Sequence, residues 1–489
     1  MAIAHVRAKA ATERFKAQLR AQGEKLTIAE LVPLPPTNGP NGAQDFLNAT
    51  RRLSSLSYQL SPGSMKMLKP GRARVAWQQP ALATEEATNI WPELKREIES
   101  REEGFRDLRA ALAQSNLWFQ VNYLPGFESS SFQHLMSLKS ASQWLSAAAL
   151  LHLREQQPDL ALADLSALIV LPVRYRGEPL LISQMVRIAM VEIAAYATWE
   201  ALQYPGWRDD QLAGLQSRWI SMEFLSNSAP TLAMERACLI PVFSRSRQSL
   251  EYLGKLTDTD SALTLDGLTE KGGKLLEDPK HGLEELLDHY ARRWMWKWWH
   301  SYEDELWYLQ FLQKNIVVAR AAETADAFVP LHTELATELA RLGRPPRAFL
   351  VSRELSGAGY NIFSERQLAV ETERRLVVTA IALKRFEQRQ GRPPSDLIAL
   401  VGDYLPAMPI DPMDGHPLRY GATRDGRFLL YSVGLDGKDD GGNPARADLT
   451  SGTPTWTVGI DWVWPQPATE DEIRGFNAKL EGKRRKAKK

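Results

Sequence analysis

The chain has 489 residues, of which 44% are hydrophobic and 24% charged, so it can build a large core and has a length typical of two or three domains. The formal net charge is +1, but the six Lys and Arg residues of the last seven positions leave residues 1–482 at −5. This balance argues against specific nucleic-acid binding through a basic surface. The expected partner is a protein.

The single cysteine, Cys238, excludes an intramolecular disulfide, and its apolar neighbours predict a buried, unreactive thiol. The N-terminal residues lack the continuous apolar segment of a signal peptide. The most apolar region, residues 180–202, is interrupted by Arg187 and Glu192. We therefore expect no transmembrane segment in this chain.

The first predicted unit, residues 1–82, combines a helix with an irregular arm. Residues 1–30 have a helical pattern, whereas residues 32–42 contain four prolines and two Asn-Gly pairs, which preclude regular structure. A second irregular stretch follows at residues 61–71.

The second predicted unit, residues 83–345, is helical. Its helices begin near Thr84, where early carboxylates suit a helix N-terminus. Two helical hairpins are expected, residues 140–154 with 159–171 and residues 180–202 with 209–224. No fixed repeat period occurs, so we predict an irregular helical bundle, with a short helical-repeat array as the alternative.

One predicted helix, residues 283–317, is rich in aromatic residues. Positions 283, 287, 290, 294, 298, 302, 306 and 309 recur at spacings of three and four, which predicts a buried face, and Trp296, Trp299 and Trp307 lie off it. A helix that is apolar on several sides is typical of the centre of a bundle. The alternative is a groove for a partner helix or a carbohydrate.

A Gly-Arg-Pro-Pro break at residues 343–346 precedes the third predicted unit, residues 346–465. It should contain a helix at 364–390, a capped turn at 395–400 and strands at 418–420, 428–432 and 457–464. Asp425-Gly426 between the first two strands indicates a hairpin. The charged tail, residues 466–489, is expected to be solvated and disordered.

Turn-rich backbone between these strands carries a cluster of acidic residues. The five aspartates are Asp411, Asp436, Asp439, Asp440 and Asp448. Carboxylate and carbonyl oxygens in such loops are the ligands that calcium prefers, so the composition predicts a structural calcium ion. The alternative is that the aspartates form Asx turns in a solvated loop.

A longer pattern runs through the same region. A helix and a Pro-Pro turn are followed by Leu-Pro-x-x-Pro-x-Asp-Pro-x-x-Gly-x-Pro-x-x-Tyr over residues 405–420 and by Ser-x-Gly-x-Asp-Gly over residues 432–437. Residues 364–464 thereby resemble the globular head of the major pseudopilin of type II secretion systems. The whole chain resembles bacterial proteins that join a helical domain to such a head. The resemblance implies a small α+β head made of one long helix and a three-stranded antiparallel meander.

The resemblance also implies a calcium-held loop after the second hairpin strand. It assigns Asp436 and Asp448 as carboxylate ligands and Val433 as a ligand through its backbone carbonyl. Asp439, Asp440 and Asn443 lie inside the same loop and are further candidate ligands.

Three residue patterns qualify the resemblance. The helix before the head carries Arg366, Arg374 and Arg375 among other charges, too many for packing into a pseudopilus, so a recruited head is expected. Met413 replaces the aromatic residue that the family has after Asp-Pro. Asp411 is expected to be structural, because an Asp-Pro turn needs no metal.

The helical region also offers a candidate enzymatic site. The acidic and histidine residues of the aromatic helix invite a metal-carboxylate hypothesis; they are Glu284, Glu285, Asp288, His289, His300, Glu303 and Asp304. A di-iron bundle would need Glu-x-x-His in two helices, and neither this helix nor any other has that pair. Solvated charges are therefore the better interpretation, and no phosphate-binding or dinucleotide motif occurs.

The sequence thus predicts a mainly α protein with a pseudopilin-like head. Its expected function is non-catalytic binding or scaffolding in a bacterial surface or secretion-related assembly, which favours an extracytoplasmic or envelope location. The alternatives are an enzyme with a site in the helical domain and a cytoplasmic helical-repeat adaptor.

Overall fold

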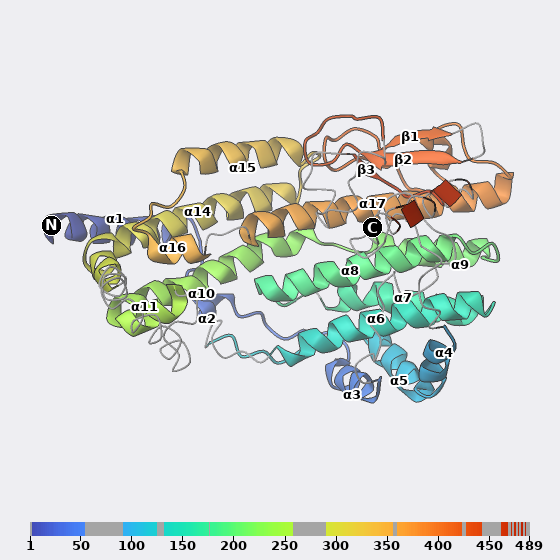
Figure 1. The fold of residues 1–489 in the computed structure, drawn as a ribbon, viewed down its shortest axis with the longest axis horizontal. Helices are drawn as coiled ribbons and strands as arrows, with labels where there is room; N and C mark the ends of the chain where they lie inside the picture. Colours follow the sequence, from blue (N-terminus) through green and yellow to red (C-terminus); the bar gives the residue numbers. More distant parts are fainter. Residues whose placement is uncertain are drawn as a thin grey trace.

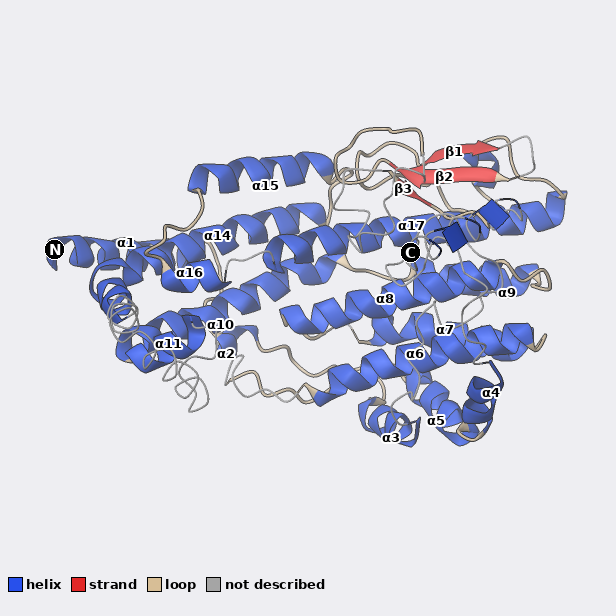
Figure 2. Ribbon diagram, in the orientation of Figure 1, coloured by secondary structure: helices blue, strands red, loops and turns tan. Residues whose placement is uncertain are grey.

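The protein is mainly helical and carries one small three-stranded antiparallel sheet, as the sequence predicts (Figures 1 and 2). The computed structural model describes residues 2–53, 91–124, 132–175, 177–257, 290–355, 359–422, 427–442 and 461–467, and beyond these only 471, 474, 475, 478, 481, 482 and 485.

The N-terminal half contains a series of helices before the aromatic region. They are α1 (Ala2–Ala21), α2 (Ile28–Leu31), α3 (Ala43–Leu53), α4 (Trp91–Glu99), α5 (Glu102–Ala113), α6 (Gln133–Arg154), α7 (Pro158–Arg174), α8 (Leu181–Leu202), α9 (Asp209–Ile220), η2 (Leu225–Asn227), α10 (Ser228–Gln248) and α11 (Leu250–Thr257).

The C-terminal half adds further helices and the sheet. They are the π-helical turn η3 (Trp296–His300), α14 (Ser301–Ala322), α15 (Val329–Leu342), α16 (Leu350–Leu355), α17 (Gly359–Gln390), η4 (Leu397–Leu400), β1 (Arg419–Ala422), β2 (Phe428–Ser432) and β3 (Trp462–Val463).

The long helices run roughly along the longest axis of the molecule in stacked layers (Figure 1). The short helices α3, α4 and α5 cover α6 and α7 on one side, α8 and α9 form the middle, and α17 separates them from the sheet on the other side (Figure 1). The predicted hairpin of α6 and α7 is confirmed, and Pro158 begins the second helix at its first position.

One continuous hydrophobic core joins these layers. It extends from Phe46 in α3 through Trp144 in α6 and Trp199 in α8 to Leu430 in β2. The predicted units 83–345 and 346–465 share this core, and the Trp199 indole donates a hydrogen bond to the carbonyl of Pro465 at 2.8 Å. The C-terminal region is therefore packed onto the helical body.

Helix α17 is enclosed along its middle. Residues 371–373 and 376–383 are buried, which covers more than one face of the helix. Helices α8 and α9 pack on it, and β2 packs on it as well. This helix is therefore part of the interior of the protein.

Helix α8 is the one helix of the described residues that is long and apolar enough to cross a membrane, and 72% of its apolar window is buried within the protein. Its mean hydropathy only reaches 1.2 over that window, and Arg187 and Glu192 lie in its buried part. No clear membrane-spanning segment is thus found in the described part of the chain.

The prediction for the aromatic helix was wrong at positions on both sides of residue 300. Trp294 and Trp298, expected in the core, are 56% and 49% exposed, whereas Trp296, expected off the core face, is 0% exposed. The π-helical turn at residues 296–300 accounts for the error, because a π turn holds an extra residue and shifts the buried face by one position. Beyond it, Leu309 is buried in α14 as predicted, but Trp307, which was predicted to lie off the buried face, is buried as well.

The sheet has the order β1-β2-β3 with antiparallel pairing throughout. Arg419 pairs with Tyr431 between β1 and β2, and Ser432 pairs with Trp462 between β2 and β3. The first two predicted strands are confirmed, and only the end of the third belongs to the described residues. The predicted Asp425-Gly426 turn lies outside them.

Candidate functional site

The Asp-Pro segment before β1 forms a compact turn. The amide of Asp411 donates to the carbonyl of His416 at 2.7 Å, and the amide of Gly415 donates back to the carbonyl of Asp411 at 2.9 Å. Gly415 has a φ of 77°, a left-handed conformation that favours glycine. This segment also meets the start of α15, where the amide of Phe328 donates to the carbonyl of Pro412 at 2.8 Å.

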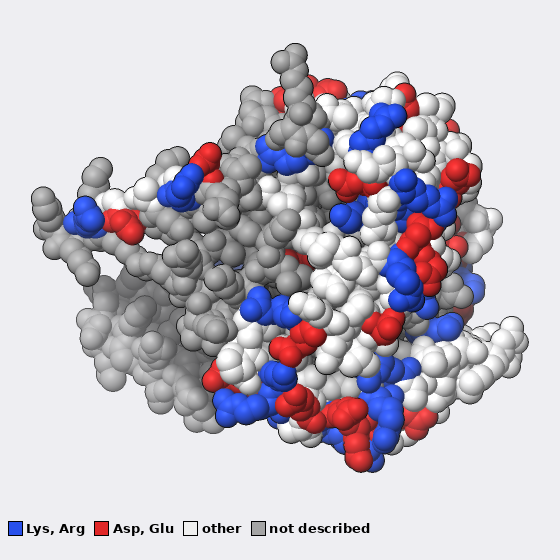
Figure 3. Space-filling model, turned by 90° about the vertical axis from the view of Figure 1, so that its right-hand side faces the viewer, with Lys and Arg blue, Asp and Glu red and all other residues white. Residues whose placement is uncertain are grey.

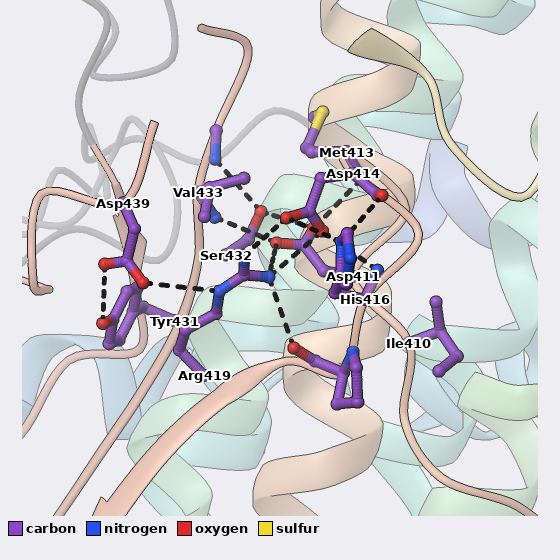
Figure 4. Close-up of polar contacts among 12 residues, drawn as sticks. Ile410, Asp411, Met413, Asp414, His416, Arg419, Tyr431, Ser432, Val433 and Asp439 are labelled. Carbon is purple, nitrogen blue, oxygen red and sulfur yellow. Dashed lines mark hydrogen bonds and ion pairs between the residues drawn. The ribbon is translucent and has the colours of Figure 1, made fainter. Parts of the chain in front are cut away.

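Asp411 is fully buried at the centre of this turn (Figure 4). Its Oδ1 accepts hydrogen bonds from the amide of Met413 at 3.0 Å and from Ser432 Oγ at 2.7 Å, and its Oδ2 accepts one from the amide of Val433 at 2.9 Å. Burial raises the pKa of Asp411 above its ordinary value, although these hydrogen bonds oppose the shift. The carboxylate has the contacts of a structural group, which fits the role expected for it.

Arg419 on β1 connects this turn to the loop that follows β2 (Figure 4). Its Nη1 donates to Asp414 Oδ1 at 3.1 Å and to Asp411 Oδ2 at 3.4 Å, and its Nε lies 3.6 Å from Asp439 Oδ2. Burial raises the pKa of Asp414, but the hydrogen bonds from Arg419 and from the His416 amide, together with the charge of Arg419, outweigh burial, and the pKa is lowered overall. A single guanidinium thus bridges three of the acidic side chains.

The loop after β2 is shaped by Asx turns. Asp436 Oδ1 accepts a hydrogen bond from the amide of Lys438 at 3.1 Å, and Asp439 Oδ1 accepts one from the amide of Gly441 at 2.9 Å. Asp439 Oδ1 also accepts a hydrogen bond from the Tyr431 hydroxyl at 2.9 Å. Burial and this hydrogen bond raise the pKa of Tyr431 to about 12. Asx turns are the alternative that the sequence left open for these two aspartates.

Gly442 closes the loop against the sheet. Its φ is 63°, and a Cβ atom at this position would lie 2.6 Å from Cδ1 of Tyr431. Its amide donates a hydrogen bond to Asp461 Oδ2 at 2.7 Å. The position therefore requires glycine for both its backbone conformation and its close packing.

Asp461, immediately before β3, is a residue that the sequence reasoning missed. It is 6% exposed, and its Oδ1 has no hydrogen-bond partner among the described residues. Burial raises the pKa of Asp461, the backbone amides of Gly442 and Asp440 oppose the shift, and the carboxylates of Asp439 and Asp440 add to it. The available signal was a lone carboxylate within a predicted apolar strand.

The predicted calcium ligands are only partly within the described residues. Val433, Asp436, Asp439 and Asp440 lie there, whereas Asn443 and Asp448 lie outside. The side chains of Asp436 and Asp439 are exposed, and the side chain of Val433 is fully buried. No group of three or more His, Cys, Asp or Glu side chains in the described part of the chain is arranged to hold a metal ion. The fit to calcium is therefore partial.

A concave surface of about 450 Å³ lies beside this loop, on the exposed side of β1 and β2. Its lining includes Arg419, Tyr420 and Tyr431. The Tyr420 hydroxyl donates to the carbonyl of Pro394 at 2.8 Å, which ties β1 to the Pro-Pro turn after α17. The surface is open to solvent, as suits contact with a larger molecule.

The three enzymatic candidates of the helical region that the structure describes, His300, Glu303 and Asp304, are not assembled into one site. His300 Nδ1 lies 3.2 Å from Glu303 Oε2 at the surface, and Asp304 is buried elsewhere on the same helix. Glu284, Glu285, Asp288 and His289 lie outside the described residues. Neither His300 nor Glu303 lines the concave surface on β1 and β2.

Two other histidines form buried pairs that the sequence did not indicate. His134 Nε2 lies 2.9 Å from Glu178 Oε2, and His152 Nδ1 lies 2.8 Å from Asp164 Oδ2. His152 also lines a cavity of about 200 Å³. Asp164 also pairs with Arg109, so this buried carboxylate has two side-chain partners and joins α5, α6 and α7.

Comparisons of the chain with known protein families, with curated proteins and with solved structures give no match. The pseudopilin-like interpretation accordingly depends on the motif residues alone.

Proposed function

We propose that the protein is a non-catalytic scaffolding or binding component of a bacterial surface or secretion-related assembly, in which calcium orders the loop after β2. The calcium part of this proposal is supported mainly by the environment of Asp461. A buried carboxylate oxygen without a hydrogen-bond partner is costly, and two further carboxylates beside it add repulsion. A divalent cation would offset both costs.

The chemistry of the loop is compatible with calcium. Calcium accepts six to eight oxygens in flexible geometry, so carboxylates can be combined with backbone carbonyls and water. We assign Asp440 and Asp461 as carboxylate ligands in addition to the Val433 carbonyl. Asp436, Asp439, Asn443 and Asp448 remain proposed ligands from the resemblance. The role of the ion would be structural.

The scaffolding part of the proposal is supported by the position of α17. In a pseudopilus the corresponding helix must pack against other subunits, whereas here residues 376–383 are buried inside the same chain. The C-terminal region would therefore act as a fixed part of a rigid body. Its concave surface on β1 and β2, next to the loop, is the proposed contact surface for a protein partner.

Thermal unfolding tests the calcium part. The native chain, Asp461→Asn and the exposed-site control Asp403→Asn are compared in millimolar calcium, in millimolar magnesium and in chelator. An ion present at a hundredfold excess over its Kd stabilises the folded state by about 2.7 kcal/mol. We expect calcium to raise the Tm of the native chain and of Asp403→Asn but not that of Asp461→Asn. A native chain that does not respond to calcium would leave the aspartates as turn formers only.

The partner part is tested separately. The native protein and the double variant Tyr431→Ala, Arg419→Ala each carry a C-terminal tag, by which they are purified from the bacterium that produces the protein. We expect the native chain to elute in a complex larger than the monomer, and the variant to elute as a folded monomer. If both elute as monomers while calcium still stabilises the native chain, the scaffolding role is wrong and the calcium site stands.

A further inference from the structure

A partly enclosed cavity of about 40 Å³ lies where η2 and the start of α10 meet α14, α15 and α17. Most of the side chains that line it are apolar, among them Leu225, Phe328, Leu331 and Leu368. A buried water needs roughly 10–15 Å³ of such space, so the cavity has room for about three waters or for a small organic group. Apolar walls that carry a few polar groups are typical of sites for small molecules.

One polar side chain of this lining has an oxygen without a partner. Asn315 on α14 is 2% exposed, and its Nδ2 donates a hydrogen bond to the carbonyl of Phe311 on the preceding turn at 2.9 Å. Because Nδ2 is engaged by the helix backbone, Oδ1 is the atom of this amide that is left for the cavity. Oδ1 accepts no hydrogen bond from any described residue. A buried acceptor in this state is costly, so the oxygen is a ready site for a hydrogen-bond donor.

The polar groups around Asn315 and on the charged surface have partners nearby. On the end of the molecule shown in Figure 3, Lys and Arg are interspersed with Asp and Glu. In the cavity lining, Ser228 Oγ donates a hydrogen bond to Gln367 Oε1. His332 is half-exposed at the rim, and its Nε2 lies 3.7 Å from Glu365 Oε1. Asn315 Oδ1 is therefore the one buried side-chain oxygen or nitrogen of the described lining without a hydrogen-bond partner.

Helix α15 forms the outer wall of the cavity and lies on the outside of the bundle over α14 (Figure 1). Leu335 is the one buried residue of this helix. Its start is anchored, because the amides of Phe328 and Val329 donate to the carbonyls of Pro412 and Met413 at 2.8 and 2.9 Å. The cavity is thus covered by a helix that is fixed at one end and lightly packed along its length, so a small ligand can enter beneath it without opening the main core.

We propose that this cavity binds the hydroxyl end of a small, neutral aliphatic molecule, whose O–H group donates a hydrogen bond to Asn315 Oδ1. A carboxylate end would place a second acceptor against this oxygen. A cationic end would be buried without a counter-charge, because the described lining contains no Asp or Glu. A hydroxyl group is the smallest neutral donor, and the volume of the cavity admits it together with the first carbons of its chain, which pack against the apolar walls.

A ligand-observed NMR titration of the full chain tests this proposal with two isomers, n-hexanol and methyl n-pentyl ether. Both contain the same atoms, but only the alcohol has a hydrogen-bond donor. We expect the native chain to bind n-hexanol with a millimolar or lower Kd and to bind the ether about tenfold more weakly, which is the effect of one buried hydrogen bond. Hexanoate should also bind more weakly than the alcohol. Equal affinity for the two isomers, or no binding of n-hexanol at millimolar concentration, overturns the proposal.

Three variants show whether the ligand lies in this cavity. Asn315→Leu keeps the volume of the side chain but removes the unpaired oxygen, so it should fold and bind the two isomers with equal affinity. Ala319→Met extends a side chain from α14 into the cavity and should bind neither isomer. Asn48→Leu, at an exposed position of α3, is the matched control and should bind like the native chain. A native preference for the alcohol in Asn315→Leu would place the site elsewhere and overturn the proposal.

Discussion

The Asp411 carboxylate accepts a hydrogen bond from the backbone amide of Val433 at 2.9 Å, across 22 positions of the sequence. This contact joins the turn before β1 to the end of β2, and the Ser432 hydroxyl adds a second link to the same carboxylate. The buried carboxylate serves as the hydrogen-bond acceptor for the backbone amides at this junction. The stability of the turn and of the end of β2 therefore depends on one side chain.

Replacing Asp411 should strongly destabilise the protein. Asp411→Ala leaves the amides of Met413 and Val433 and the Ser432 hydroxyl buried without their acceptor. We expect a loss of about 2–4 kcal/mol in the free energy of unfolding, measured by urea denaturation at constant m-value. Asp403→Ala, at an exposed turn, should change the free energy by less than about 0.5 kcal/mol. Equal effects of the two substitutions would contradict the structural role of Asp411.

Two neighbouring glycines allow the energetic cost of backbone strain in the loop to be measured apart from the cost of poor packing. Gly441 and Gly442 have φ values of 78° and 63°, but only at Gly442 would a Cβ atom meet another group, the Tyr431 ring. Gly441→Ala should cost about 1 kcal/mol, and Gly442→Ala at least about 1 kcal/mol more. Chemical denaturation of both variants measures the difference. Indistinguishable stabilities would mean that the loop does not pack on Tyr431.

The indole of Trp296 should contribute through its hydrogen bond as well as through its burial. Trp296→Phe keeps an aromatic ring but removes a donor to the buried carboxylate of Asp304. We expect a destabilisation of about 1–3 kcal/mol in thermal or chemical unfolding. Trp294→Phe, at an exposed position of the same helix, serves as the control and should lie within about 0.5 kcal/mol of the native chain. The reverse order of the two effects would refute the register shift at the π-helical turn.

The pH dependence of stability should report on Glu24. Burial raises the pKa of Glu24, but hydrogen bonds from Arg320 and Arg236 outweigh it and lower the pKa to about 2. Because the folded-state pKa is depressed, the contribution of Glu24 is present above pH ~4.5 and is lost as the pH falls toward 2. At pH 7, the free energy of unfolding of the native chain should exceed that of the Glu24→Gln variant by about 2 kcal/mol.

Denaturation curves at several pH values measure this difference, which should shrink below pH ~4.5 and nearly vanish near pH 2. Glu13→Gln, on the exposed side of α1, is the matched control and should change stability by less than about 0.5 kcal/mol at pH 7. A stability difference between the native chain and Glu24→Gln that stays constant with pH would show that Glu24 acts through shape and not through charge.

Local sequence determined the elements of this protein. Pro158 and the Ala/Leu-rich segments around it are enough to predict α6 and α7, because helix propensity and capping act over a few residues. The Asp-Pro turn and the first two strands of the sheet were also predictable, since glycine, proline and alternating apolar residues restrict the backbone locally.

Tertiary structure alone decided which faces are buried and which carboxylates meet. The outward direction of Trp294 and Trp298 follows from the hydrogen bond of Trp296 to Asp304, a carboxylate that also binds the start of α16, and no period in the sequence reveals this contact. Asp461 approaches Asp439 and Asp440 because β3 pairs with β2 across a long connection. Such contacts depend on chain closure and core packing over many residues, so their energies are set by the folded molecule and not by the local pattern.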